Sequence, residues 1–298
     1  MRKHPIIFGM LILLTFGTLL YLSFYNAGAS SSRGRSFSLK DKIGVVPIEG
    51  VISDSKEVIE QLDEFGKDGS VAAVVLRIDS PGGGVAASQE IYDAVLELKK
   101  TKKVVVSMGS IAASGGLLVA CAADKIVANP GTITGSISAI MQFANFEELM
   151  KKIGMKSSVI KSGEYKDIGS PLREMTPQEK NIIQDLVDDI FDQFIDVIVK
   201  ERKLTREQVL AIADGRVFSG RKAKELGLVD ELGDMASAVK LAGHLAGKKG
   251  KYDLVYPSKK RNALLDYFLE GAASRISDSL REKMESGSGL NYIYYPAR

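Results

Sequence analysis

Two glycine-rich stretches that contain serines are the part of this sequence best suited to chemistry. They run from Ser80 to Gly84 and from Ser110 to Gly116, and each directly follows a predicted β-strand. Glycines let backbone N–H groups approach a ligand closely, and a strand-to-helix junction directs several of them at one point, where they can stabilise an oxyanion. Neither stretch fits the Walker loop or the dinucleotide pattern. Glycines used only for turn geometry remain an alternative, but two stretches at successive strand ends favour a site.

Ser114 is the candidate nucleophile in the second stretch. It precedes an apolar helical run and is followed by Gly115 and Gly116, which would place its hydroxyl at the positive end of a helix. The nucleophile elbow of the α/β-hydrolases requires glycine two residues before the serine, and Ala112 occupies that position. The alternative is a serine that merely caps the helix.

A serine nucleophile needs a base, and the histidine content restricts the choice. The chain has two histidines, His4 near the N-terminus and His244 on a late predicted helix without an orienting acid nearby. A Ser-His-Asp triad is therefore not expected. A lysine can serve as base when burial and neighbouring dipoles lower its pKa, although composition alone does not identify which lysine.

The composition excludes several classes of function. The net charge is +3, with 40 basic and 37 acidic residues interleaved, so nucleic acid is not an expected partner. The single cysteine, Cys121, rules out an intramolecular disulfide and lies in an apolar run that predicts burial. Two histidines and one cysteine are too few for zinc or metal-hydroxide chemistry, so we predict no metal and no cofactor.

The N-terminal region is predicted to be a membrane anchor. Residues Pro5 to Tyr25 carry no charged side chain and are long enough to cross the hydrocarbon core as a helix. Basic residues precede this segment, which places the N-terminus in the cytoplasm and the bulk of the chain outside. A cleaved signal peptide is the alternative, because Ala27 to Ala29 are small residues. We therefore expect a cytoplasmic tip and anchor at 1–27 and a flexible stalk at 28–42.

The following residues alternate short β-branched runs with amphipathic helical patterns, which predicts an α/β domain with a largely parallel sheet. A helix is predicted at Val85–Lys99. Capping boxes at Thr176–Glu179 and Thr205–Gln208 predict the starts of two further helices, and Ser219 is predicted to open a short one. The predicted strands are Ile43–Ile48, Val71–Ile78, Lys103–Met108, Lys125–Ala128 and Ser157–Lys161.

Residues 249–298 have a different sequence pattern from the preceding α/β region and are predicted to form a helical appendage and tail. An amphipathic pattern runs from Leu265 to Leu280, and the aromatic stretch Asn291 to Tyr295 follows a Ser/Gly linker. Subunit packing, membrane contact and contact with a neighbouring active site all remain open for this region.

Six motifs in this order resemble the signal peptide peptidase A family between about Ile43 and Leu245. They are Asp79–Gly83, Ala113–Gly116, Asn129–Pro130, Gly135–Ile137, Lys161–Lys166 and Gly215–Gly220. The resemblance implies the Clp protease and crotonase fold, built from repeated ββα units, over a peptidase domain at 43–248. One departure is Ser138, where the family often has glycine, and it bears on the pocket wall and thus on substrate preference rather than on mechanism.

The resemblance also implies a serine-lysine dyad and its supporting groups. The nucleophile motif falls on Ser114 and the lysine motif on Lys166, with Lys161 as a weaker candidate. The implied oxyanion hole consists of the backbone N–H groups of Gly83 and Gly115, and Ser136 is expected to hydrogen-bond the lysine amine. Longer family members contain two related halves, whereas this chain has one, which implies a homo-oligomeric ring.

The expected function is a membrane-anchored serine endopeptidase that cleaves hydrophobic peptides, chiefly signal-peptide remnants, on the outer side of the cytoplasmic membrane. Two alternatives remain at this point. A crotonase-like acyl-CoA enzyme would share the fold and use similar backbone donors. A catalytically silent membrane scaffold would use Ser114 and Lys166 only for capping and packing.

Overall fold

The computed structural model describes Thr15, Gly17, Thr18, residues 41–257 and residues 291–293. Most of the predicted anchor at 1–27 and of the stalk at 28–42, and the predicted helix at Leu265–Leu280, lie outside the described residues. Within the described part of the chain, no helix is both long and apolar enough to cross a membrane.

Residues 41–257 are built around one sheet, in which the central strands are parallel. The strands lie in the order β7-β6-β4-β2-β1-β9, and β5 pairs with both β4 and β8. Only β7 runs antiparallel to its neighbour β6 in this sheet. Their bounds are β1 Lys42–Glu49, β2 Val71–Ser80, β4 Lys103–Ala113, β5 Lys125–Ala128, β6 Ile133–Gly135, β7 Val217–Ser219, β8 Glu231–Leu232 and β9 Asp253–Val255.

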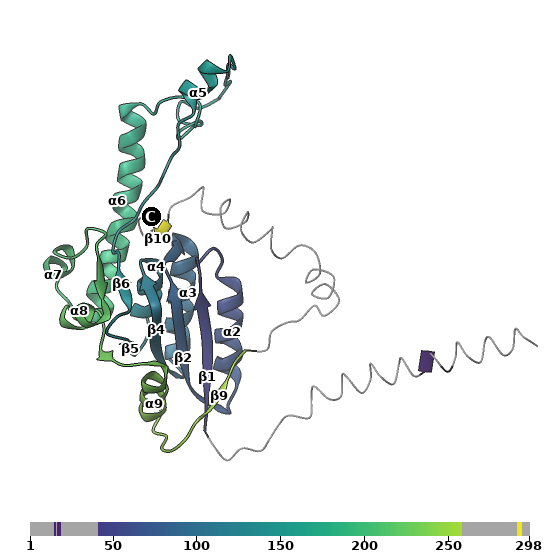
Figure 1. Ribbon diagram of the computed structural model, residues 1–298, viewed down its shortest axis with the longest axis vertical. Coiled ribbons are helices and arrows are strands. Elements are labelled where there is room, and N and C mark those ends of the chain that lie inside the picture. The colour runs from purple at the N-terminus through teal and green to yellow at the C-terminus, as the bar shows by residue number, and fades with distance from the viewer. Residues whose placement is uncertain (1–14, 16, 19–40, 258–290, 294–298) are drawn as a thin grey trace, which may run out of the picture. The chain divides into compact units, whose positions relative to one another are not determined.

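Helices pack on both faces of this sheet (Figure 1). Along β2, Val74 and Leu76 belong to the larger core cluster, whereas Val75 belongs to the smaller cluster beneath α9. Both faces are therefore buried, which explains why the strands read as continuous apolar runs. The helices are α2 Lys56–Lys67, α3 Val85–Lys99, α4 Gly115–Cys121, α5 Glu147–Lys152, α6 Pro177–Arg202, α7 Arg206–Leu210, α8 Gly220–Glu225 and α9 Met235–Leu245.

The α/β class, the parallel sheet and four of the five predicted strands are confirmed. Helix α3 has the predicted bounds, and the predicted capping boxes at Thr176 and Thr205 are both formed. The predicted strand Ser157–Lys161 is wrong: this stretch forms no strand, and Ile160 is fully exposed. A short apolar run cannot become a strand without a neighbouring edge to pair with. At the other end of the domain, β9 pairs with β1, so the sheet extends beyond residue 248.

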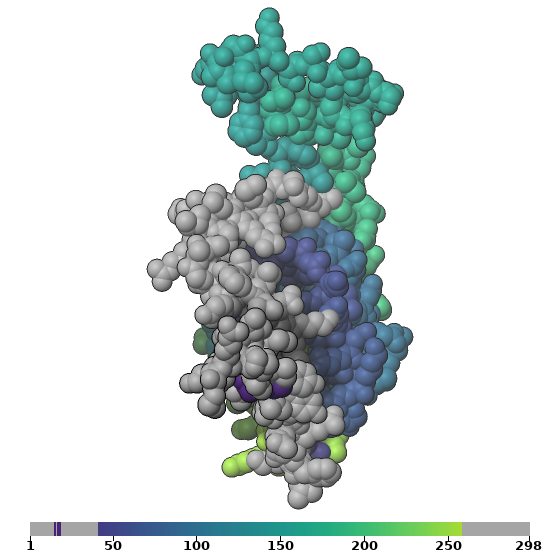
Figure 2. All heavy atoms as spheres, turned by 90° about the vertical axis from the view of Figure 1, so that its right-hand side faces the viewer, coloured from purple at the N-terminus to yellow at the C-terminus, as the bar shows by residue number. Residues whose placement is uncertain are grey.

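Residues 140–176 form an arm that projects from the sheet domain (Figure 1). The arm follows β6, contains α5 and leads into α6. Near its C-terminal end α6 is anchored in the core by Phe194, Ile195 and Ile198. Its N-terminal part extends outward to the arm, whose teal atoms lie at the top of the space-filling view, above the blue atoms of the earlier elements (Figure 1 and Figure 2).

Candidate active site

The two glycine-rich stretches meet at the carboxyl ends of β2 and β4. These strands are parallel neighbours, and Ser80 pairs with Ala112 after an irregularity that follows Ile78. A Cβ atom placed on Gly115 would lie 3.4 Å from the Cα atom of Gly82, so the two backbones are in close contact. The prediction that both stretches lie at the carboxyl ends of parallel strands is therefore confirmed, and the structure also brings them together.

Gly83 lies in the short strand β3, Gly82–Gly84, which packs tightly against the segment after β1. Ile52 donates its N–H to the carbonyl of Gly82 at 2.9 Å, and Gly84 donates to the carbonyl of Ile52 at 2.8 Å. A Cβ atom on Gly83 would lie only 2.1 Å from the Ile52 oxygen. Close approach of two backbones therefore requires glycine at this position.

The other edge of β3 is paired with the chain's own C-terminal region. Strand β10, Asn291–Ile293, runs antiparallel to β3, with Tyr292 opposite Gly83. The backbone of β10 also lies against α4, the helix that follows Ser114. The edge of β3 beside the candidate nucleophile thus accepts an extended chain.

Ser114 adopts a strained backbone conformation at the start of α4. Its φ is 54° and its ψ is −119°, a region that non-glycine residues rarely occupy. Its N–H donates to the carbonyl of Gly135 at 2.8 Å, and its carbonyl accepts from Leu118 at 3.0 Å. The hydroxyl is buried, forms no capping bond and has no hydrogen-bond partner among the described residues. Ser114 is therefore more than a helix cap, and its Oγ is left available for chemistry.

Ser136 lies beside Ser114 because β6 pairs with the end of β4. Thr132 and Thr134, both buried, donate their hydroxyls to the carbonyls of Gly109 and Ala112 at 2.7 and 2.6 Å. Ser136 itself has a positive φ of 51°. Ser114 and Ser136 thus follow two adjacent strands, and buried serines with strained backbones are typical of a functional site.

The motif Gly215–Gly220 helps to hold the backbone of the loop that carries Ser136. Arg216 supplies the carbonyl that accepts the N–H of Ser136 at 2.8 Å. At the end of the motif, a Cβ atom on Gly220 would lie 2.1 Å from the carbonyl oxygen of Asn129. The motifs around Asn129 and Gly215 therefore hold the backbone of the Ser136 loop in place.

Lys166 lies elsewhere, on the arm between α5 and α6. Its side chain is exposed, and the structure records no partner for it among the described residues. Within one chain the described structure therefore brings Ser114, Gly115, Gly83 and Ser136 together and leaves Lys166 apart. His244 is exposed on α9, as predicted.

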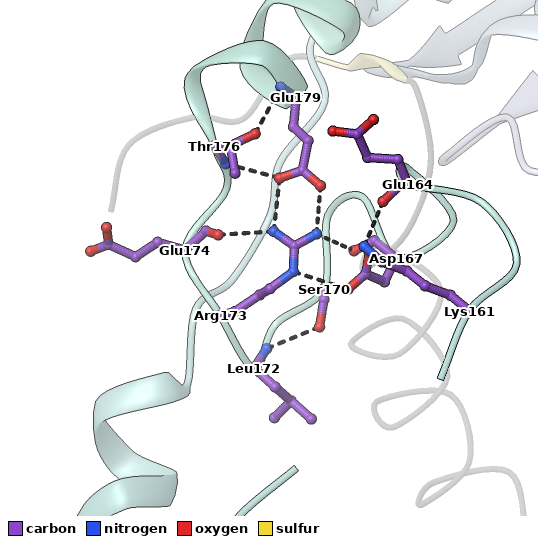
Figure 3. Close-up of polar contacts among 9 residues, drawn as sticks. All are labelled: Lys161, Glu164, Asp167, Ser170, Leu172, Arg173, Glu174, Thr176 and Glu179. Atoms are coloured by element: carbon purple, nitrogen blue, oxygen red, sulfur yellow. Dashed lines mark hydrogen bonds and ion pairs between the residues drawn. The ribbon is translucent and has the colours of Figure 1, made fainter. Parts of the chain in front are cut away.

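An ion-pair network connects the Lys166 segment to α6 (Figure 3). Arg173 donates from Nη1 to Glu179 at 2.7 Å and from Nε to Asp167 at 3.0 Å. Lys161 also donates to Asp167. No local sequence pattern predicts this network: the capping box at Thr176 identifies Glu179, but nothing nearby in the sequence identifies Arg173 as its partner.

These contacts stabilise the charged forms of both carboxyl groups. The hydrogen bonds from Arg173 and then from the Thr176 N–H lower the pKa of Glu179 from its ordinary 4.5 to about 2. The pKa of Asp167 is held well below its usual range, chiefly by Arg173 and then by Lys161. Glu179 is only 2% exposed, so its charge depends on this pairing.

Comparison with known proteins identifies the family. The profile of peptidase family S49 matches residues 97–249, which include Ser114 and Lys166, and the Clp protease profile matches residues 39–134, which include Gly83. The chain belongs to peptidase family S49, the signal peptide peptidase A family. This S49 protein is therefore a serine peptidase whose α/β domain contains a Clp protease region.

Three relatives show how far the similarity of this S49 peptidase extends. A proposed protease of Synechocystis sp. is 45% identical over 212 residues, which cover 70% of this chain and 76% of that protein. A proposed signal peptide peptidase SppA of Enterococcus faecium is 34% identical over 206 residues, 64% of this chain and 60% of that protein. Protease 4 of Haemophilus influenzae is 36% identical over 223 residues, 72% of this chain and 36% of that protein.

Replacing Gly83 by alanine is expected to damage both stability and activity. The new Cβ would collide with the Ile52 carbonyl, so β3 must shift, and we expect a fall in Tm on the order of 5 °C and at least a roughly tenfold loss of peptide hydrolysis. The matched control is Gly84→Ala, whose Cβ would meet Ile52 at an ordinary 3.6 Å. Equal behaviour of the two variants would contradict the tight approach of β3.

The low pKa of Glu179 predicts an acid-dependent contribution to stability. Its charged form is favoured in the folded state, so the contribution is fully present above about pH 4.5 and is lost as the pH falls through about 2. The difference in Tm between the native protein and Glu179→Gln should therefore shrink between these pH values. Glu225→Gln, which removes an exposed partner of Lys222, should change Tm little throughout. A Glu179→Gln difference that is constant with pH would exclude this linkage.

Proposed function

We propose that this serine peptidase cleaves hydrophobic peptides, chiefly signal-peptide remnants, with Ser114 as nucleophile and Lys166 as general base. The observation that carries the proposal is Ser114 itself: its backbone is strained, and its buried hydroxyl has no hydrogen-bond partner among the described residues. It stands at the start of α4, where two glycine-rich backbones converge. This combination supports a nucleophile beside an oxyanion site.

The proposed reaction uses this arrangement together with Lys166. Ser114 Oγ attacks the scissile carbonyl carbon while the neutral amine of Lys166 takes the hydroxyl proton, and Ser136 orients that amine. The N–H groups of Gly83 and Gly115 donate to the oxyanion that develops. Collapse of the intermediate transfers the proton to the leaving amine and forms an ester on Ser114, and water then hydrolyses the ester with Lys166 again as base.

The position of the substrate is supported by the pairing of β3. Because β10 already runs antiparallel along Gly82–Gly84, this edge is suited to an extended peptide backbone. Main-chain hydrogen bonds would then supply affinity without reading the substrate sequence. We propose that the substrate takes the same antiparallel course past Ser114.

The base is proposed to come from a neighbouring copy of the chain. Among the described residues nothing hydrogen-bonds to Ser114 Oγ, and Lys166 is exposed on the arm. The arm also exposes large apolar side chains, which supports coverage by another subunit. These are Ile140, Phe143, Phe146, Leu149, Ile153, Met155, Val159 and Ile160. Head-to-tail contacts that present one subunit's Lys166 to the next subunit's Ser114 would close into a ring.

Two further observations support the proposed substrate class and location. The relative from Enterococcus faecium is named a proposed signal peptide peptidase, and residues Pro5 to Tyr25 of this chain form an uncharged apolar segment preceded by basic residues. We propose that this segment anchors the peptidase, with the catalytic domain on the outer side of the cytoplasmic membrane. Hydrophobic peptides left in that membrane would then lie within reach.

The alternatives differ in what they require of Ser114. Membership of a peptidase family favours peptide hydrolysis over an acyl-CoA reaction. A silent scaffold has no use for a strained serine whose buried hydroxyl finds no partner in the part of the chain that the structure describes. Covalent labelling of Ser114 by a fluorophosphonate would distinguish an active peptidase from a scaffold.

Ser114→Ala and Lys166→Ala are each expected to lower peptide hydrolysis about a thousandfold or more, because the nucleophile and its base act as a unit. Lys161→Ala is the control and should lower peptide hydrolysis by no more than about fivefold. Lys161 pairs with Asp167, but Arg173 also pairs with Asp167 and remains after the substitution. The assay uses the full chain in detergent and an apolar fluorogenic peptide. An inactive Lys161→Ala with an active Lys166→Ala would reverse the assignment of the base.

Mixing two inactive variants tests whether the site is shared. Ser114→Ala subunits retain Lys166, and Lys166→Ala subunits retain Ser114, so some mixed interfaces would pair the two intact residues. Co-assembly is expected to restore hydrolysis in proportion to those interfaces. If verified mixed assemblies are no more active than either parent, the dyad lies within one chain.

A further inference from the structure

The segment that carries Lys166 has little internal rigidity of its own. It contains no helix or strand between α5 and α6, and its backbone bonds are local turns apart from two contacts with the start of α5. There the Pro171 carbonyl accepts the Phe146 N–H at 2.7 Å, and the Glu174 N–H donates to the Glu147 carboxylate at 3.1 Å. The Lys166 N–H donates to the Gly163 carbonyl at 3.2 Å, and the Ser170 N–H donates to the Asp167 carbonyl at 3.0 Å. A catalytic amine must be held to within a fraction of an ångström, so this segment needs an external support.

Arg173 provides that support directly beside Lys166. It donates hydrogen bonds to Asp167, the residue that follows Lys166, at both a side-chain oxygen and the backbone carbonyl. Arg173 Nε donates to Asp167 Oδ2 at 3.0 Å, and Nη2 donates to the Asp167 carbonyl at 3.3 Å. The backbone that follows Lys166 is therefore fixed by one guanidinium group.

The opposite side of the same guanidinium is attached to α6. Both Nη atoms of Arg173 donate to the carboxylate of Glu179, which also accepts the Thr176 N–H at 2.8 Å as part of the capping box. Glu179 belongs to the first turn of α6, and Phe194 anchors the same helix in the core. A continuous series of contacts thus runs from the core through α6, Glu179 and Arg173 to the backbone beside Lys166.

The geometry of this bridge is specific to arginine. The planar fork of Arg173 engages the two carboxylate oxygens of Glu179 while its Nε engages Asp167 (Figure 3). A lysine ammonium keeps the charge but cannot make the paired contacts in one plane. The two carboxylates are also balanced by two cations, because Lys161 pairs with Asp167. The network is therefore neutral and needs no further ion.

We propose that Arg173 is a positioning residue for the catalytic lysine, holding the Lys166 segment to the N-terminal end of α6 so that the amine is presented at one fixed place. This proposal rests on the proposed function, in which Lys166 is the base. It extends the site to a residue that contacts neither the substrate nor Ser114.

The test is Arg173→Lys in the full chain, assembled in detergent and assayed with an apolar fluorogenic peptide. Because misplacement of a catalytic group by about 1 Å can cost on the order of 100-fold, kcat is expected to fall at least about tenfold while KM stays within about twofold. The matched control is Arg206→Lys. Arg206 also bridges two carboxylates, Asp192 and Asp196, at 2.7 Å each, but on the exposed side of α6. Arg206→Lys should leave kcat unchanged.

A double-mutant cycle separates positioning from a merely structural role. The readout is the rate at which a fluorophosphonate labels Ser114. Arg173→Lys should slow labelling when Lys166 is present and have no further effect in the Lys166→Ala background, because its influence passes through the amine. An unchanged kcat for Arg173→Lys, or an equal slowing of labelling in both backgrounds, would overturn the proposal.

Two further outcomes, a variant that does not fold and an active Lys166→Ala, have the following consequences for the proposal. If Arg173→Lys does not fold, Asp167→Asn, which keeps the shape and removes the charge held by Arg173, is put through the same cycle with the same criteria. If Lys166→Ala hydrolyses peptide like the native protein, the proposed function itself fails and the positioning role fails with it. An inactive Lys166→Ala together with a fully active Arg173→Lys rejects the positioning role alone.

Discussion

The parallel pairing of β2 with β4 is the constraint on which the rest of the site depends. Both strands are buried on two faces, so their register is set by packing rather than by any single contact. That register brings Ser80 opposite Ala112, and the glycines that follow then meet backbone to backbone. A Cβ atom on Gly83 would lie 2.1 Å from the Ile52 carbonyl oxygen, and one on Gly115 would lie 2.4 Å from the hydroxyl of Ser88, so neither position has room for a side chain. The adjacent strand β6 then fixes Ser136 beside Ser114.

Those parts of the structure that follow from local chemistry could be predicted from the sequence. The apolar runs of β1, β2, β4 and β5 predict buried parallel strands, because a strand covered on both faces has no polar side. The bounds of α3 follow from helical periodicity, and the start of α6 follows from a threonine, a proline and a glutamate in capping positions. The convergence of two glycine-rich strand ends is a general property of parallel sheets. The peptidase family could be recognised from its motifs.

Features that depend on distant partners could not be predicted in this way. Strands β3, β6 and β7 are only three residues long and exist because a neighbour supplies an edge. The stretch Ser157–Lys161 has similar β-branched residues but no such edge, and it is not a strand. The strain at Ser114 arises from the junction of β4 with α4, which residue types do not reveal. The pairing of Arg173 with Glu179 likewise depends on how the arm turns back onto α6.

The left-handed backbone at Ser114 and Ser136 has a consequence for the evolution of this chain. Glycine would adopt φ values of 54° and 51° without the steric cost that a serine incurs, which is of the order of 1–3 kcal/mol at each position. Folding alone would therefore favour glycine at both positions. In a lineage released from catalysis, selection for stability would favour glycine at these two sites, and the most stable sequence for this fold would lack the proposed nucleophile.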